Sequence, residues 1–327
     1  MKLSIVGSFL ATTAGVCCGL GALPAVAQTY PAKPVRIIVP FAPGGGVDLV
    51  ARILAQRLTE GMKQTFFVEN RAGASGMIGA EFVAKSPPDG YTLFVGSQTT
   101  QAVVPAIYAG RVSYDPVRDF APVTVVASSP LLLAVHPSLP IRTVKDLIAL
   151  AKSRPGQLTF GAAFGGSPHM AGELFKLMAG VSMLFVPYKG EGPAVADALG
   201  GQISMVFSNI PVVLPQVRAG RLRGVAVTSP ERMPNASDIP TVSESGLPGY
   251  ELATWFGLFG PAAMPHDIIV RLQSEAARGL NVREVKEKLL GQGLFVVANT
   301  PEQFAALLKS EIPRWTKVVK EAGLKPE

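Results

Sequence analysis

The chain has 327 residues, of which 48% are hydrophobic and 16% are charged, and its formal net charge is +7. This apolar fraction is enough for packed cores and excludes a disordered chain, and the length allows two domains of ordinary size. The basic residues are dispersed without a lysine or arginine run, so the charge does not indicate nucleic-acid binding.

Residues 1–27 have the pattern of a secretory signal peptide. Lys2 is followed by a long uncharged stretch, and Ala25-Val26-Ala27 fits the small-x-small rule for cleavage. We expect cleavage after Ala27, and an N-terminal membrane anchor is the alternative for the same segment. Both cysteines, Cys17 and Cys18, lie within it, so we expect neither a disulfide nor a thiolate metal site in the mature chain.

The next seventy residues predict alternating strands and helices. Short β-branched or aromatic runs at 35–39, 66–68 and 91–95 predict strands. A helix that begins near Asp48 and a shorter one that ends near Lys85 are expected between them. The order β-α-β-α-β is typical of a parallel sheet.

The middle of the chain predicts a second α/β unit. A long extended run covers 122–135, and Thr143 with Asp146 predicts the N-terminal cap of a helix. Further strands are expected at 158–161, 184–186, 203–207 and 222–227, and further helices at 170–178 and 193–199.

The C-terminal part is expected to be helical. Ile268 and Leu272 begin an apolar stripe, and Thr300-Pro301-Glu302-Gln303 predicts a capping box with proline at the first helical position. These helices have no sheet of their own, so we expect them to pack on an earlier unit. Uncharged runs such as 90–110 and 198–217 are interrupted by proline, glycine pairs or polar clusters, so they predict buried strands with turns rather than transmembrane helices.

A glycine-rich loop between the first strand and the first helix is the strongest candidate for a binding site. Gly44, Gly45 and Gly46 stand directly before Val47-Asp48. Glycines let backbone N–H groups turn toward a ligand, and the start of a helix favours an anion. The loop has neither the P-loop nor the dinucleotide-binding pattern. The alternative is a tight strand-to-helix turn in which Asp48 caps the helix.

A second glycine-rich turn, Phe164-Gly165-Gly166-Ser167-Pro168-His169, joins a strand to a helix in the other α/β unit. Ligands in open α/β sheets bind at the carboxyl ends of strands, so the two turns predict a cleft that holds a small organic anion. Ser167 would add a hydroxyl group. The segment 97–99, which follows the third strand, would line the same edge.

Other candidates carry weaker signals. Tyr188, Ser208 and Asn209 follow strands and either face the cleft or lie in surface turns. Trp255 is either a core residue or a support for the ligand, and His169 either contacts the ligand or has a turn or capping role. No nucleophile–base pair, histidine metal motif or calcium loop is present in the sequence, so we expect no catalytic residue, no metal site and no cofactor.

At these residues the sequence resembles the Bug family of periplasmic solute receptors, the TctC-like binding proteins of tripartite tricarboxylate transporters. The matching stretches run in family order from residue 30 to about residue 320 and include PVRIIVPFAPGGGVD, ENRAGASGMIGAEFVAKSPPDGYTL, SYDPVRDFAPVT, VPYKGEGPAVADALGGQ, DIPTVSESGLPGYE and TWFGLFGPAAMP. Together these stretches are specific to the family, although no single one would be.

The resemblance implies a two-lobed periplasmic-binding-protein fold of type II, with a cleft between two mixed α/β domains and crossing hinge strands. The first domain would comprise 28–127 and 253–327, and the second 128–252. The loops 41–46 and 164–169 would hold a carboxylated ligand, and the bulky Phe164 suggests a ligand with an apolar or aromatic part. The full set of expected contacts is Phe41, Ala42, Gly44, Gly45, Gly46, Asp48, Ser97, Gln98, Thr99, Phe164, Gly165, Gly166, Ser167, His169, Tyr188, Ser208, Asn209 and Trp255.

The sequence thus predicts a non-catalytic periplasmic receptor. Its expected partners are a small carboxylate (a dicarboxylate, tricarboxylate, acidic amino acid or aromatic acid) and integral-membrane transporter subunits. A ligand-sensing subunit for a sensor kinase is an alternative, and a secreted enzyme that uses the same cleft is another.

Overall fold

The computed structural model describes residues 30–326. The predicted signal peptide and both cysteines lie outside the described residues. Among the residues described, no helix is long and apolar enough to cross a membrane.

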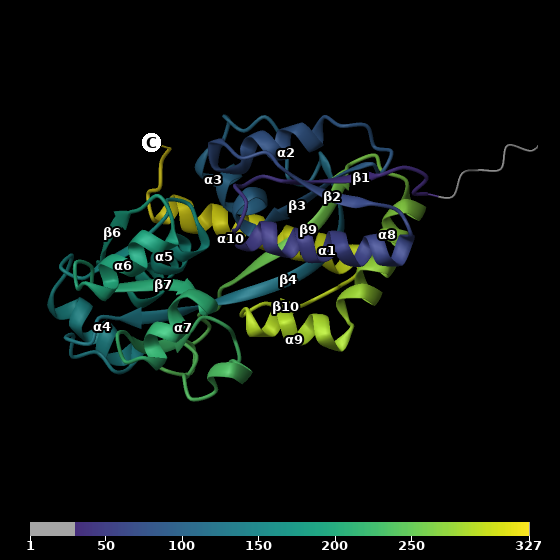
Figure 1. The fold of residues 1–327 in the computed structure, drawn as a ribbon. Coiled ribbons are helices and arrows are strands. Elements are labelled where there is room, and N and C mark those ends of the chain that lie inside the picture. Colours follow the sequence, from purple (N-terminus) through teal and green to yellow (C-terminus); the bar gives the residue numbers. More distant parts are fainter. Residues whose placement is uncertain (1–29, 327) are drawn as a thin grey trace, which may run out of the picture.

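The first half of the molecule is a sheet covered by helices on both faces (Figure 1). The strands β1 (Val35–Val39), β2 (Phe66–Asn70) and β3 (Thr92–Ser97) are parallel, and β3 pairs antiparallel with β9 (Ala253–Pro261). The side chains of β1 alternate between two cores, because successive residues of a strand point to opposite faces. Ile37 packs with α1 (Gly46–Met62) and α8 (His266–Leu280), and Ile38 packs with α2 (Met77–Ala84).

The second half is a smaller mixed sheet with its own helices. Its strands are β5 (Thr159–Ala162), β6 (Leu184–Pro187), β7 (Met205–Asn209) and β8 (Arg223–Val227). Its helices are α4 (Val144–Ser153), α5 (Ser167–Ala179), α6 (Glu191–Leu199) and α7 (Ile210–Arg218). The strand β5 is parallel to both β6 and β7.

One long strand, β4 (Phe120–Val135), connects the halves. Its first part pairs with β9 and its last five residues pair with β7, so one ten-stranded sheet runs through the whole molecule. The chain enters the second half along β4 and returns along β9 (Figure 1). The predicted α/β fold with two lobes and crossing strands is confirmed, whereas the domain boundaries at 127/128 and 252/253 stay a prediction.

The C-terminal helix α10 (Pro301–Glu321) packs on both halves rather than on one. Phe304 and Leu308 lie in a core of the first half, and Trp315, Val318 and Val319 lie in a core of the second. Its capping box at Thr300 and that of α4 at Thr143 form as predicted.

Several short elements were not predicted. The segment after β3 forms a π-helix at Thr99–Val103 and the helix α3 (Val104–Ile107). Helix α7 lies in an uncharged run that was interpreted as strand and turn, and α9 (Arg283–Gly291) and the two-residue β10 (Phe295–Val296) were also missed. Proline at the start of α7 is compatible with a helix, since the first N–H groups of a helix have no partner within it.

Candidate ligand-binding site

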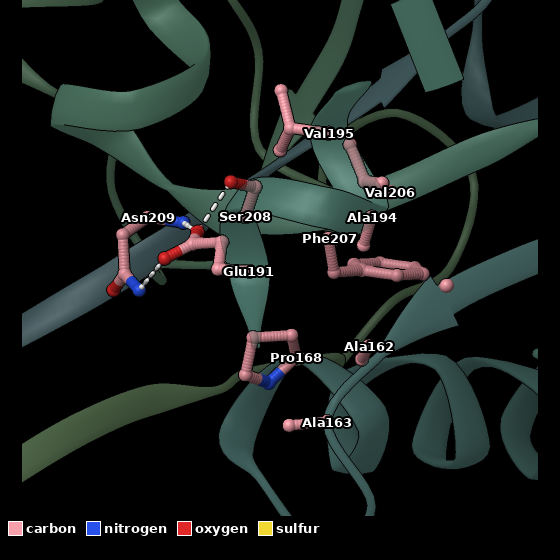
Figure 2. A pocket seen from close by; sticks show the side chains of 11 residues that line it. Ala162, Ala163, Pro168, Glu191, Ala194, Val195, Val206, Phe207, Ser208 and Asn209 are labelled. Carbon is pink, nitrogen blue, oxygen red and sulfur yellow. Dashed lines mark hydrogen bonds between the residues drawn. The ribbon is translucent and has the colours of Figure 1, made fainter. Parts of the chain in front are cut away.

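A cavity of about 490 Å³ lies between the two halves. The glycine loop and α1 line it from the first half, and the end of β7 and the start of α7 line it from the second. Its wall comprises Gly44, Gly45, Gly46, Asp48, Leu49, Arg52, Ser129, Glu191, Asn209, Pro211, Val212, Phe256, Gln292 and Leu294. A smaller cavity of about 150 Å³ is lined by β5, α6 and β7 and shares Glu191 and Asn209 with the larger one (Figure 2).

The glycine loop presents the N-terminus of α1 to the larger cavity. Gly44 has a φ of +92°, a conformation that favours glycine, and residues 42–46 are exposed. The first hydrogen bond of the helix runs from the Leu49 N–H to the Gly45 carbonyl. The N–H groups of residues 46–48 therefore precede the helical ladder and favour an anion at this end of the cavity.

Asp48 holds this loop in place, although it is not the N-cap residue that one interpretation of the sequence expected. The N-cap is Gly45, and the Asp48 carboxylate accepts hydrogen bonds from the Gly44 N–H at 3.0 Å and from Asn70 Nδ2 at 2.9 Å. Arg52 binds both oxygens, at 2.9 and 3.0 Å. Burial alone raises the pKa of Asp48, but these hydrogen bonds outweigh it, so the pKa lies below its usual range. The charge of Asp48 is therefore matched by Arg52.

The second glycine loop is organised around His169, which is fully buried. Its Nδ1 accepts a hydrogen bond from the Gly165 N–H at 3.0 Å, and its ring stacks on Phe185 with the centroids 3.8 Å apart. The Gly166 N–H donates to the Ala163 carbonyl, and Phe164 packs beside the histidine ring. Two of the amides expected to bind ligand are thus used within the loop. Ala163 and Pro168, rather than the glycines, line the smaller cavity.

Gln98 and Ser167 belong to a buried polar network that connects the halves. Gln98 Nε2 donates to Glu311 of α10 at 2.7 Å, and Trp315 Nε1 donates to the same carboxylate oxygen at 2.8 Å. Ser167 Oγ lies 3.5 Å from Gln98 Oε1. These side chains do not line either cavity, so the network supports the hinge region rather than the cavity wall.

Ser97 and Thr99, the sequence neighbours of Gln98, are also part of local structure. The Ser97 N–H donates to Thr100 Oγ1 at 3.0 Å, and Thr99 begins the π-helix.

The start of α6, which follows β6, contributes a residue that was not predicted from the sequence, Glu191. Ser208 Oγ donates to Glu191 Oε1, the Asn209 N–H donates to the same oxygen at 2.5 Å, and Asn209 Nδ2 donates to Oε2 at 2.8 Å (Figure 2). Ser208 and Asn209 were expected either to contact a ligand or to lie in surface turns. In the structure they line the smaller cavity and position this carboxylate. The available signal was that Glu191 begins a helix at the carboxyl end of a strand, where ligands bind.

Tyr188 lines neither cavity. Its hydroxyl donates to Asp197 of α6 at 2.6 Å, and burial together with this aspartate raises its pKa to about 12.

Aromatic residues near the cleft divide between core and cavity. Trp255 is 3% exposed and packs edge-on against Phe304, whereas the next residue, Phe256, lines the large cavity. The alternation along β9 explains this, because adjacent residues face opposite sides of the sheet. Phe41 is half-buried against the α1 core and its carbonyl accepts from Asn70, and Ala42 is exposed in the loop.

Six of the eighteen predicted contacts therefore line a cavity: Gly44, Gly45, Gly46, Asp48, Ser208 and Asn209. Ala42 is exposed in the glycine loop, and the others lie behind the walls, in the hinge or in a core. Whether any of them contacts a ligand stays a prediction. Among residues 30–326, no group of three histidine, cysteine or acidic side chains is placed to hold a metal ion.

Two α/β halves that share crossing strands and enclose a cavity define a solute-binding protein of the periplasmic type. The chain belongs to the tripartite tricarboxylate transporter family of receptors, whose family model matches residues 50–324. It is 39% identical over 324 residues to protein BugT of Bordetella pertussis, covering 99% of this chain and 98% of that one. The resemblance to the Bug family is therefore confirmed.

Solved structures share the whole fold. The R. palustris protein Rpa4515 with adipate is 40% identical with a TM-score of 0.80, and the match covers 91% of this chain and 100% of that one. MatC from Rhodopseudomonas palustris with bound malate is 32% identical with a TM-score of 0.76, and the match covers 89% of this chain and 100% of that one. Both of these structures contain small carboxylates.

Proposed function

We propose that this protein captures a small carboxylated solute in the cavity between its halves and does not transform it. The observation that carries the proposal is the N-terminus of α1, where the N–H groups of residues 46–48 precede the helical ladder beside a cavity of about 490 Å³. A carboxylate is an anion of suitable size for such a helix start. The adipate and malate bound by relatives support the same chemical class.

The binding step would be followed by hinge closure and delivery. The halves are joined by β4, β9 and α10, so they can rotate about these crossing segments while each core stays intact. We propose that the closed form docks on the membrane subunits of a tripartite transporter after export to the periplasm by way of a cleaved signal peptide. The second candidate function is that of a sensory subunit that presents its closed form to a sensor kinase, because hinge closure would serve signalling as well as transport.

A thermal-shift screen tests the proposal. The chain without its predicted signal peptide is titrated with monocarboxylates, dicarboxylates and amino acids, adipate and malate included. A ligand at 100 times its Kd stabilises the folded state by about 2.7 kcal/mol, which raises the Tm by several degrees. NMR of the recovered ligand then distinguishes binding from turnover. Absence of any shift across the panel, or conversion of a bound acid to product, would overturn the proposal.

A further inference from the structure

The cavity wall carries an acidic group that a receptor for simple dicarboxylates does not need. Glu191 lines both cavities, and its carboxylate accepts three hydrogen bonds from Ser208 and Asn209. The backbone N–H and the side-chain Nδ2 of Asn209 can only donate, so the arrangement suits an ionised carboxylate. A carboxylate can accept about four hydrogen bonds, which leaves a position on Glu191 Oε2 for a ligand donor.

Among residues 30–326, the carboxylate of Glu191 forms no ion pair. No lysine, arginine or histidine lies within 4.0 Å of it among the residues that the structure describes, since it forms none of their salt bridges. The other two charged residues on the large cavity wall, Asp48 and Arg52, neutralise each other. The wall therefore has a formal charge of −1, located at the second half.

The two ends of the cavity therefore favour different groups. The start of α1 on the first half suits a carboxylate, whereas Glu191 on the second half suits a cation and repels a second carboxylate. The donors of Ser208 and Asn209, which would otherwise bind that second carboxylate, are bonded to Glu191.

We propose that the ligand is a zwitterion, with one carboxylate at the start of α1 and one protonated amine at Glu191. This inference rests on the proposed function and narrows it: among small carboxylates, the chain selects those that also carry an ammonium group.

The test compares ligands of matched length. Adipate is paired with 6-aminohexanoate, glutarate with 5-aminopentanoate and succinate with 4-aminobutanoate, and each Kd is measured by calorimetry at low salt. Wild-type protein is expected to bind the amino acid of at least one pair ten or more times more tightly than its dicarboxylate. Acetylation of the amine, which removes the positive charge, should abolish that preference.

The variant Glu191→Gln removes the charge and keeps one carbonyl acceptor. We expect it to reduce the preference for the amino acid at least tenfold. Glu231→Gln, the same change at an exposed position away from both cavities, should leave the preference unchanged. Circular dichroism and thermal unfolding establish whether both variants fold. If Glu191→Gln does not fold, the comparison of ligand pairs on wild-type protein still decides the inference.

The outcomes separate the two proposals. If dicarboxylates bind wild-type protein as tightly as their amino partners or more tightly, the zwitterion inference is overturned and the carboxylate site stands. If folded wild-type protein binds no compound of either series or of the wider acid panel, the proposed function fails and the inference fails with it.

Discussion

Replacing Gly45 with aspartate tests whether a ligand carboxylate occupies the start of α1. Gly45 is the N-cap of this helix, with φ −83° and ψ 170°, a conformation that every L-residue adopts. A Cβ atom at this position would meet no other atom within 4 Å. The substitution therefore adds a charge to the anion site without a steric cost to the fold, and Gly45→Asn is its uncharged control of the same size.

The expected loss of affinity follows from the distance between the two charges. An aspartate at the N-cap would lie on the order of 5 Å from a carboxylate bound at the same helix start, where the repulsion is about 3 kcal/mol at an effective dielectric of 20 and about 0.8 kcal/mol in water. The loop is exposed, so an intermediate value of about 1.4–2.7 kcal/mol is appropriate, which weakens binding roughly ten- to a hundredfold. Asparagine and aspartate cap helices better than glycine by a few tenths of a kcal/mol, so neither variant should unfold more easily.

Calorimetry with the tightest carboxylate from the screen gives the Kd of each variant, and urea unfolding gives its stability. We expect Gly45→Asp to lose binding and Gly45→Asn to retain most of it. Equal affinity in all three proteins would refute the placement of the carboxylate at α1. An equal loss in both variants would show that close backbone approach, rather than charge, governs the site.

Three further predictions concern the interactions that stabilise the fold, and urea unfolding measures each of them. Asp48→Asn should lower stability at pH 7 by roughly 1–2 kcal/mol, since a charged hydrogen-bond network is lost beside a half-exposed arginine. The pKa of Asp48 is lower in the folded state than in the unfolded state, where it lies near 4, so the ionised carboxylate stabilises the fold above about pH 4 and this stabilisation is lost at lower pH. The difference in unfolding free energy between Asp48→Asn and wild type should therefore vanish on acidification. A difference that persists at pH 2 would contradict the stabilising role of the Asp48 charge. Trp315→Phe should lower the free energy of unfolding by about 1–2 kcal/mol more than Trp255→Phe, because the indole N–H of Trp315 donates to a buried carboxylate, whereas that of Trp255 has no acceptor among residues 30–326. Equal losses would mean that this hydrogen bond does not contribute to stability. Gly172→Ala should destabilise by about 1–3 kcal/mol, because its Cβ would overlap a phenylalanine ring of β5, whereas Gly192→Ala, also helical, meets no atom within 4 Å and should be neutral or stabilising.

The architecture was predictable because its signals are local. Each β-branched run of the first hundred residues became a strand, and both capping boxes formed where the sequence placed them. The missed helix α7 had no comparable signal, because its sequence contains two prolines, is uncharged up to Arg218, and is compatible with a buried strand and a turn. Short apolar runs do not distinguish strand from helix by periodicity.

The cavity wall was less predictable than the fold, because a strand end fixes where a residue lies but not where its side chain points. Trp255 and Phe256 are adjacent, yet only Phe256 reaches the cavity. His169 lies in a glycine loop, yet its buried ring accepts a hydrogen bond from the Gly165 N–H of the same loop and lines neither cavity. Glu191 was overlooked because an acid is unexpected in an anion receptor, and its role depends on donors from a different strand.

The helix α10 has a consequence for how the protein matures. Its 21 residues supply buried side chains to the cores of both halves, so neither core is complete until the last part of the chain has been synthesised. A ribosome-bound chain that lacks this segment leaves apolar surface uncovered on both sides of the hinge. Premature compaction of either half is thereby disfavoured until α10 is present.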